Sequence, residues 1–344
     1  MKKILIVGAT YSNNFGDMLF AKMIADTLYM DNEIKFYKLS EFAKNFVGEE
    51  KISDFKNAEA DALVYMPGGF FGDRHVTSLI VTLYWFVRYF PIGLSFAFKG
   101  KPILVLGVGA GPCKYWIMRR IIQYICSRSK RVIVREEDSR DFLKTLGINS
   151  EVTSDLAQLI SRYDFKDIPL KKNNKKKLLV HVNQNQNVAS VIIPAVKKFY
   201  SKHKEDYSIV LASDQVCANE SIIFEQLLDF ARDDVELYRY KDPLELCSVI
   251  SQCDVVVSYK LHVGIVACSF GKSVIAVPEH YKKVERYYKH IGYPERVLPF
   301  YLAESSTVFD LIERYHEEYI TVPPHILHAA DKNYHYLIKF VGEL

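Results

Sequence analysis

Two patterns of hydrophobic and polar positions alternate along the chain. Short apolar runs bounded by Gly, Pro or Asp alternate with longer stretches in which apolar residues recur at helical spacing. This alternation is typical of βα units that build a parallel sheet. In the first half it predicts strands at 3–8, 34–39, 61–66, 102–107 and 131–136, and helices at 16–29, 75–98, 114–127 and 136–146.

The same alternation begins again after a polar, lysine-rich segment, "FKDIPLKKNNKKK" at 165–177, whose composition is that of a solvated linker. Two series joined by one linker predict an α/β protein with two doubly wound, Rossmann-like domains and a ligand cleft between them. We expect an N-terminal domain at 1–165, a C-terminal domain at 176–305, and C-terminal helices at 306–344 that could pack back on the N-terminal domain. The strands predicted for the second series are 177–182, 207–213, 235–240, 253–258 and 273–278.

Three glycine-rich loops directly follow predicted strands of the first domain: "GATYSNNFGD" (8–17), "PGGFFGD" (67–73) and "GVGAGP" (107–112). Glycine lets backbone N–H groups approach a ligand closely, although tight strand-to-helix turns also require it. Three such loops at one edge of a sheet favour a binding site, for which Gly69 and Gly109 are candidates. None of them matches the dinucleotide-binding or P-loop fingerprint.

Charged residues also stand at predicted strand ends. Arg135 ends the strand in "RVIVREEDS", and its planar fork suits a carboxylate or a phosphate. Asp155 in "TSDLA" is equally consistent with a helix cap and a ligand contact, and for Asp17 in the first loop a helix cap is favoured over a ligand contact. In the second domain, Lys260 and His262 of "SYKLH" combine a point charge with a group that titrates near neutral pH.

The next strand is followed by "PEHYKKVERYYKHIG", which carries His280, Lys282 and Lys283. Cationic and proton-active residues therefore gather on two neighbouring strand ends, which indicates an anion site. The histidines lack the spacing of a metal site, and no Gly-x-Ser-x-Gly elbow is present. We accordingly expect no metal and no cofactor.

The segment 79–98 is almost continuously apolar and aromatic, with Arg88 as its only charge. Its length approaches that of a membrane span, but Pro91 is expected to break it near the middle. A buried or partly exposed helix, shallow insertion at a bilayer surface and a true span all remain open. The basic, aromatic segment 114–131 that follows favours peripheral membrane contact over a span.

Composition narrows the class of protein. A net charge of +4 over 344 residues suits an anionic small substrate and falls short of a nucleic-acid-binding surface. The six cysteines form no C-x-x-C pair, which predicts reduced, buried thiols in a cytoplasmic protein, with peripheral attachment to the inner membrane face left open. The apolar run of "MKKILIVGAT" is too short for a signal peptide and is better interpreted as a first strand.

Taken in order, these motifs resemble the polysaccharide pyruvyl transferase family. The matching pieces run from residue 8 to 292: "NNFGD", "PGGFFGD", "GVGAGP", "VREEDS", "SDLA", and "KLHVGIVACSFGKSVIAVPEHYKKVERYYKHIG" at 260–292, the most specific of them. The resemblance implies a GT-B-like pair of Rossmann lobes. It also implies transfer of pyruvate from phosphoenolpyruvate onto a sugar of a cell-surface glycan or a lipid-linked precursor, as a ketal.

The resemblance further implies that Arg135, Lys260 and Leu261 help to bind the donor, together with Lys283, and that His262 serves as the acid. The family usually has arginine where this chain has Lys260, so the charge is kept and the bidentate fork is lost. Asp17 is a candidate for contacting or deprotonating the sugar hydroxyl. Two alternatives are a GT-B glycosyltransferase that uses a nucleotide sugar and a non-catalytic glycan-binding homologue.

Overall fold

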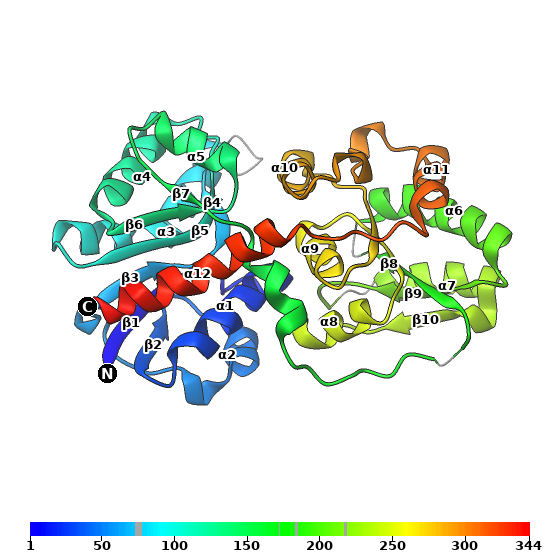
Figure 1. The fold of residues 1–344 in the computed structure, drawn as a ribbon, viewed down its shortest axis with the longest axis horizontal. Coiled ribbons are helices and arrows are strands. Elements are labelled where there is room, and N and C mark those ends of the chain that lie inside the picture. Colours follow the sequence, from blue (N-terminus) through cyan, green and yellow to red (C-terminus); the bar gives the residue numbers. More distant parts are fainter. Residues whose placement is uncertain (73–77, 172, 183–184, 217–218) are drawn as a thin grey trace. The chain divides into compact units, whose positions relative to one another are not determined.

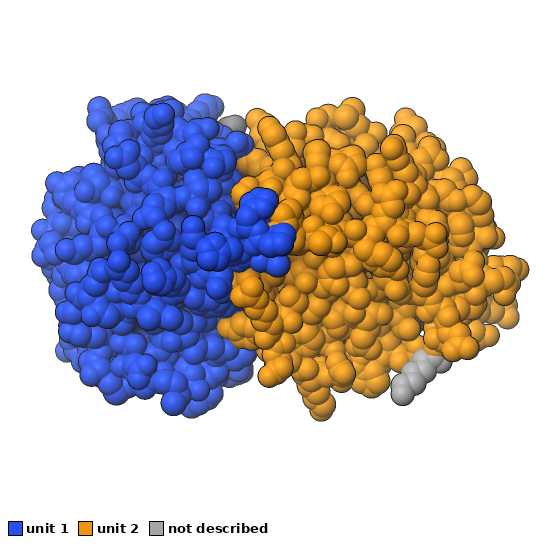
Figure 2. Space-filling view, in the orientation of Figure 1, with its two compact units in different colours: residues 1–156, 324–344 blue, residues 157–323 orange. Residues whose placement is uncertain are grey.

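The protein folds into two compact units, shown in blue and orange in Figure 2. The computed structural model describes residues 1–72, 78–171, 173–182, 185–216 and 219–344. Unit 1 consists of Met1–Leu156 and Pro324–Leu344, and unit 2 consists of Ala157–Pro323. Asp73 and Cys217, and the first residues of the helix predicted at 75–98, lie outside the described residues.

Unit 1 contains a parallel sheet in the order β2-β1-β3-β5-β6-β7, with β4 paired to β5. Apolar residues of both faces are buried, as a sheet covered by helices on both sides requires. The order reverses between β1 and β3, where doubly wound sheets bind ligands. The five predicted strands are confirmed, while β4 and β7 were not predicted. The strands are β1 (Lys2–Val7), β2 (Asn32–Phe36), β3 (Ala62–Tyr65), β4 (Gly68–Phe71), β5 (Ile103–Ala110), β6 (Arg131–Val134) and β7 (Glu151–Val152).

The helices of unit 1 pack around this sheet, and α12 crosses in front of it in Figure 1. Tyr89, Phe90 and Phe96 of α3 and Ile122 and Ile125 of α4 join one hydrophobic core with the sheet. The helices are α1 (Phe15–Leu28), α2 (Glu41–Val47), α3 (Leu79–Phe98), α4 (Trp116–Arg128), α5 (Glu137–Lys144) and α12 (Pro324–Gly342).

Helix α3 continues through Pro91, which corrects the expectation that this residue breaks it. Proline removes one backbone donor, so the carbonyl of Val87, four residues earlier, loses its helical partner. Val87 is 59% exposed, so water can reach this side of the helix. Within the described residues, α3 is the one helix long and apolar enough to cross a membrane, and 28% of its most apolar window is buried.

Unit 2 contains a parallel sheet in the order β10-β9-β8-β11-β12, which reverses between β8 and β11. All five predicted strands are confirmed. The strands are β8 (Lys176–His181), β9 (Tyr207–Ala212), β10 (Val235–Tyr238), β11 (Val255–Ser258) and β12 (Ser273–Ala276). The helices are α6 (Gln186–His203), α7 (Asn219–Ala231), α8 (Pro243–Ser251), α9 (Leu261–Ser269), α10 (Tyr281–Ile291) and α11 (Ser305–Tyr315).

The boundaries of the two units differ from the expected 1–165, 176–305 and 306–344. Helix α11 belongs to unit 2, and α12 belongs to unit 1. The lysine-rich segment is not simply a solvated connector between the units, because it lies within unit 2 and is hydrogen-bonded to the rest of it. The Ile168 N–H donates to Ser248 Oγ at 2.9 Å, the Lys171 N–H donates to Glu236 Oε2 at 2.8 Å, and Leu170 is buried.

Candidate functional site

The two loops at the switch point of the first sheet lie side by side. β1 and β3 are paired, and the Met66 N–H continues that pairing by donating to the Val7 carbonyl at 2.9 Å. Asp17, in the first turn of α1, is half-buried, and its Oδ1 lies 3.5 Å from where a Cβ on Gly68 would be. Asp17 does not cap α1, because Asn14 Oδ1 accepts from the Gly16 and Asp17 N–H groups at 3.2 and 3.4 Å.

Two glycines predicted for the site lie at the same edge. Gly69 is exposed in β4, and Gly109 is half-exposed near the end of β5. A Cβ on Gly109 would stand 3.2 Å from Arg135 Nη2 and 3.3 Å from Arg135 Nε. Glycine at 109 therefore allows the guanidinium to lie directly against β5.

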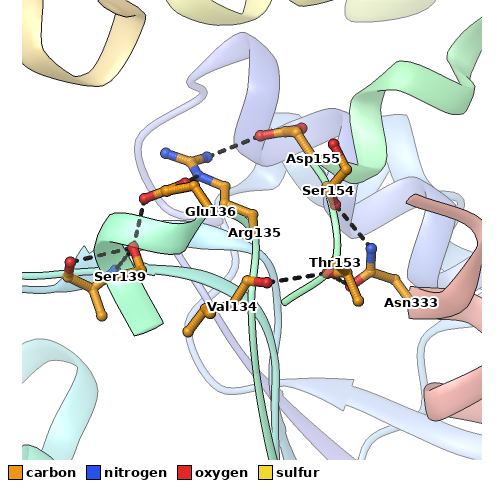
Figure 3. A network of polar contacts seen from close by, with 9 residues as sticks. Val134, Arg135, Glu136, Ser139, Thr153, Ser154, Asp155 and Asn333 are labelled. Carbon is orange, nitrogen blue, oxygen red and sulfur yellow. Dashed lines mark hydrogen bonds and ion pairs between the residues drawn. The ribbon is translucent and has the colours of Figure 1, made fainter. Parts of the chain in front are cut away.

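Arg135 is buried between two carboxylates, as Figure 3 shows. Its Nε donates to Glu136 Oε2 at 2.9 Å, and its Nη1 donates to Asp155 Oδ2 at 3.0 Å. Glu136 is held in turn by Ser139, whose Oγ donates to Glu136 Oε1 at 2.5 Å and accepts from the Ala110 N–H at 2.8 Å. Asp155 thus forms an ion pair with Arg135, which the sequence did not predict.

The electrostatics of Arg135 follow from this arrangement. Burial alone would lower the pKa of Arg135, but the carboxylates of Glu136, Asp155 and Asp17 outweigh burial and raise it. Within the part of the chain that the structure describes, no acceptor receives a hydrogen bond from Nη2. Arg135 therefore stays charged, and two of the five N–H groups of its guanidinium donate to carboxylates of the protein.

Helix α12 fixes the segment that carries Asp155. Asn333 Nδ2 donates to the Ser154 carbonyl at 3.0 Å, and Thr153 Oγ1 is 3.1 Å from Asn333 Oδ1 and 3.2 Å from the Val134 carbonyl oxygen (Figure 3). All of these groups are buried. The C-terminal helix thus supports the Arg135 network from a position remote in sequence.

In unit 2, a pocket of about 560 Å³ opens at the carboxyl ends of the strands. Its position matches the reversal of strand order between β8 and β11, where ligands of doubly wound sheets bind. Lys260 lines it, half-buried, with its ammonium 5.3 Å from the centre of the Tyr259 ring. No carboxylate of the described residues forms an ion pair with Lys260. The lining consists of Asn185, Gln186, Asn187, Gln215, Tyr259, Lys260 and Glu279.

A buried network connects three strand ends beneath this pocket. His181 of β8 lies with Nδ1 3.0 Å from Ser258 Oγ and Nε2 3.4 Å from Asp214 Oδ1. If Ser258 donates to Nδ1, a proton on His181 Nε2 faces Asp214 Oδ1. At 3.4 Å these two atoms form an ion-pair contact but no hydrogen bond of good geometry. The His181 ring stacks on Tyr259 with centroids 5.2 Å apart, and the Lys260 N–H donates to Ser258 Oγ at 3.1 Å. The network thereby fixes the turn that presents Lys260.

Asp214 is almost fully buried, and burial by itself would raise its pKa. The interaction with His181, together with the charge of Lys260, outweighs burial and lowers the pKa of Asp214 to about 2. Asp214 therefore remains ionised beneath the pocket at any physiological pH.

The remaining predicted residues lie near the same sheet edge. Leu261 and His262 are half-buried in the first turn of α9, where the helix N-terminus contributes partial positive charge. Lys283 is exposed in the first turn of α10, which follows β12, the neighbour of β11. Gly292 ends α10 with a left-handed conformation, φ 89°, which gives that glycine a structural role.

Sequence reasoning missed His181, Ser258 and Asp214. A signal was present, because "KLLVHV" places a histidine in an otherwise apolar strand and Asp214 directly follows an apolar one. Such polar residues in parallel strands are rarely buried without a partner. Among the described residues, no cluster of three His, Cys, Asp or Glu side chains could hold a metal ion.

Comparison with known proteins gives two findings. A model of the polysaccharide pyruvyl transferase family matches residues 9–281. Comparison of the sequence with curated proteins finds no match.

Solved structures resemble the whole chain. UDP-GlcNAc 2-epimerase from Neisseria meningitidis, bound to UDP-GlcNAc, has a TM-score of 0.65 and 14% identity over 98% of this chain and 100% of its own. MnaA from S. aureus, with UDP, has a TM-score of 0.67 and 14% identity over 100% of this chain and 98% of its own. HepE from Anabaena, with UDP-glucose, has a TM-score of 0.58 and 12% identity over 100% of both chains. At such identities the likeness concerns the fold, and it confirms the predicted GT-B class.

Proposed function

Because the chain belongs to the polysaccharide pyruvyl transferase family, we propose that it transfers pyruvate from phosphoenolpyruvate onto a sugar as a ketal. The acceptor is a sugar of a cell-surface glycan or of its lipid-linked precursor. The observation that carries this proposal is Lys260, a cation that lines a pocket of about 560 Å³ and pairs with no carboxylate of the described residues. An ammonium so placed is available to an anionic donor.

Phosphoenolpyruvate carries a phosphate and a carboxylate, so its binding requires at least two cationic groups. In this proposal Arg135, Lys260 and Lys283 supply them, and Leu261 contributes a donor contact beside Lys260. Lysine binds an anion as a point charge, without the bidentate geometry of arginine. The Asn185, Asn187 and Gln215 side chains of the pocket provide further hydrogen-bonding groups. Gly69 and Gly109 leave room for close approach to the backbone of unit 1.

The reaction begins with transfer of a proton to the C3 methylene carbon of phosphoenolpyruvate. This turns C3 into a methyl group and leaves C2 electrophilic. A first sugar hydroxyl attacks C2 and loses its proton. A second hydroxyl then displaces phosphate, which leaves with its bridging oxygen, and the second proton is released. The products are the cyclic ketal and inorganic phosphate.

His262 as an imidazolium is the proposed acid for the first step, because histidine can hold and release a proton near neutral pH. Asp17 is the proposed group that contacts or deprotonates the sugar hydroxyl. The reaction as proposed uses no metal and no cofactor. The five described cysteines are buried and form no disulfide with one another, which is consistent with the proposal of a cytoplasmic enzyme.

The test is incubation with phosphoenolpyruvate and a panel of glycan precursors, followed by mass spectrometry and phosphate release. We expect a product that has gained a pyruvyl group, and His262→Ala should lower kcat by roughly 10²- to 10⁴-fold, as loss of a general acid does. His335→Ala, an exposed histidine on α12, serves as the matched control and should be fully active. Unchanged turnover in His262→Ala would exclude this histidine as the acid.

A second candidate is transfer from a nucleotide sugar. One observation favours it: Glu279 and Tyr259 line the same pocket of unit 2, and a carboxylate and an aromatic ring in one pocket suit ribose hydroxyls and a base. The similar solved structures contain UDP or UDP-sugars. If this candidate is correct, UDP-GlcNAc will bind, and Glu279→Gln will weaken that binding. Phosphoenolpyruvate will not serve as a donor. A non-catalytic glycan-binding homologue would bind a glycan and turn over neither donor.

A further inference from the structure

Helix α3 presents an apolar stripe to solvent. Ile80, Tyr84 and Val87 are 78%, 58% and 59% exposed and recur at helical spacing, and Phe98 at the end of the helix is 74% exposed. The opposite side of α3 packs into the core of unit 1. A soluble domain rarely leaves so many large apolar side chains on one helix unless the surface has a partner.

Helix α4 extends this stripe. Its Trp116 is 72% exposed and Ile117 is 44% exposed. The two helices meet where Phe98 packs against Tyr124, with ring centroids 5.0 Å apart. We call the exposed residues of α3 and α4 together the α3–α4 surface; it lies entirely within unit 1.

Cations border the α3–α4 surface. A groove of about 450 Å³ on α4 is lined by Arg120, Arg128 and Tyr124, and the Arg128 guanidinium lies 3.6 Å from the centre of the Tyr124 ring. No carboxylate of the described residues forms an ion pair with either arginine. The groove therefore offers two uncompensated cations directly beside exposed aromatic side chains.

The charge of the sequence is distributed in the same way. The stretch 78–135 contains ten lysines and arginines and no aspartate or glutamate, whereas the rest of the chain has 35 basic and 41 acidic residues. The chain as a whole is only weakly basic, at +4. Positive charge is thus concentrated on the segment that carries α3 and α4.

We propose that the α3–α4 surface binds the face of a membrane that contains anionic phospholipids. Exposed Trp, Ile and Phe side chains bordered by Lys and Arg are the composition of an interfacial surface, in which the rings enter the headgroup region and the cations contact lipid phosphates. The groove with Arg120 and Arg128 receives a phosphate headgroup. Charge complementarity favours this partner over a second copy of the chain, because two copies of a surface rich in cations and free of carboxylates would repel each other.

Flotation of the full-length protein with vesicles tests the proposal. We expect binding to vesicles of phosphatidylcholine mixed with phosphatidylglycerol, weak binding to pure phosphatidylcholine, and a marked loss at about 1 M salt, where the Debye length is about 3 Å. The double variant Arg120→Ala/Arg128→Ala should partition roughly 30-fold less into anionic vesicles, at ~1 kcal/mol for each cation. The double variant Ile80→Asp/Trp116→Ser should not float.

Matched controls use residues of similar exposure outside the α3–α4 surface. Ile338→Asp on α12 and the pair Lys204→Ala/Lys241→Ala in unit 2 should float like the wild type. His262→Ala should float as well, so failure of the proposed reaction and failure of membrane binding are distinguishable. Circular dichroism checks that each variant is folded.

Three outcomes would overturn the proposal. One is the absence of flotation with any vesicle. Another is flotation that is equal for the wild type and the Ile80→Asp/Trp116→Ser variant. The third is a wild-type protein that is a dimer by light scattering and becomes a monomer in Ile80→Asp, while neither form binds vesicles. The α3–α4 surface would then be a dimer interface.

Discussion

Two cations that the sequence places at strand ends, Arg135 in unit 1 and Lys260 in unit 2, have opposite environments. Arg135 is buried, and two of its nitrogens donate to the carboxylates of Glu136 and Asp155. Lys260 is half-buried and lines a pocket, and no carboxylate of the described residues forms an ion pair with it. Its backbone, by contrast, is fixed through Ser258.

The difference shows that a charged side chain at a strand end is not always available to bind a ligand. Two of the five N–H groups of Arg135 donate to the carboxylates of Glu136 and Asp155, so we expect Arg135 to contribute to stability and to offer Nη2 to a ligand. Lys260 forms no ion pair with a carboxylate of the described residues, so we expect its ammonium to be available to an anion. We therefore expect substitutions around Arg135 in unit 1 to lower the unfolding free energy, and substitution of Lys260 in unit 2 to weaken donor binding.

The largest effect is expected from Asp155→Ala. Removing one carboxylate from a buried ion pair leaves Arg135 incompletely compensated, which costs about 3 kcal/mol of unfolding free energy. Urea denaturation measures this. Asp54→Ala, which removes a fully exposed partner of Lys35, is the control and should change the unfolding free energy by less than ~1 kcal/mol. Equal effects of the two substitutions would contradict the structural role of Arg135.

Lys260→Met is expected to act in the opposite way. Its unfolding free energy should fall by less than about 1 kcal/mol, because no ion pair is lost and only the attraction between the Lys260 charge and the Asp214 carboxylate disappears. Binding of phosphoenolpyruvate should weaken roughly 10- to 100-fold, the effect of losing a charged hydrogen-bond donor. Lys241→Met, an exposed lysine outside the pocket, should leave donor binding unchanged. A strongly destabilised Lys260→Met variant with intact donor binding would mean that Lys260 has a structural role and does not contact the donor.

A smaller effect concerns pH. The pKa of Asp214 is lowered to about 2, so its carboxylate stabilises the fold above the unfolded value of about 3.9, and this contribution is lost as pH falls toward 2. The wild type should be more stable than Asp214→Asn at neutral pH. Urea titrations between pH 6 and the acid limit should show this advantage shrinking by ~2 kcal/mol. A constant difference across that range would mean that Asp214 has an ordinary pKa.

The smallest effect is expected from Ser258→Ala. The hydroxyl contacts His181 Nδ1 and accepts from the Lys260 N–H, so its loss should cost about 1 kcal/mol and loosen the turn that carries Lys260. Donor affinity should fall only a few-fold, less than in Lys260→Met. Ser190→Ala, an exposed serine on α6, is the control for the unfolding measurement. If donor binding suffered more from Ser258→Ala than from Lys260→Met, the ammonium would not be the main donor contact.

Most of the fold could be predicted from the sequence, because the apolar runs of parallel strands are continuous and sharply bounded. The ten predicted strands all form, from β1 near the N-terminus to β12. β4 and β7 escaped prediction because they are short: "GGFF" is half glycine, and β7 has two residues. The return of α12 to unit 1 depends on contacts between distant segments, such as Asn333 with Ser154, which no local pattern contains.

The candidate site was predictable in position but not in detail. Parallel topology places Asp17, Arg135 and Lys260 at carboxyl ends of strands, so residue type and strand order suffice to find them. Whether each charge is compensated depends on partners remote in sequence: Asp155 lies 20 residues from Arg135, and His181 lies 77 residues from Ser258. The roles proposed for these residues remain predictions.

Calorimetric titration with phosphoenolpyruvate decides whether this chain binds that donor through Lys260. We expect a saturable heat with the wild type, a roughly 10- to 100-fold weaker affinity in Lys260→Met, and unchanged affinity in Lys241→Met. A wild-type protein that gives no heat with phosphoenolpyruvate and saturates with UDP-GlcNAc would contradict donor binding of this kind.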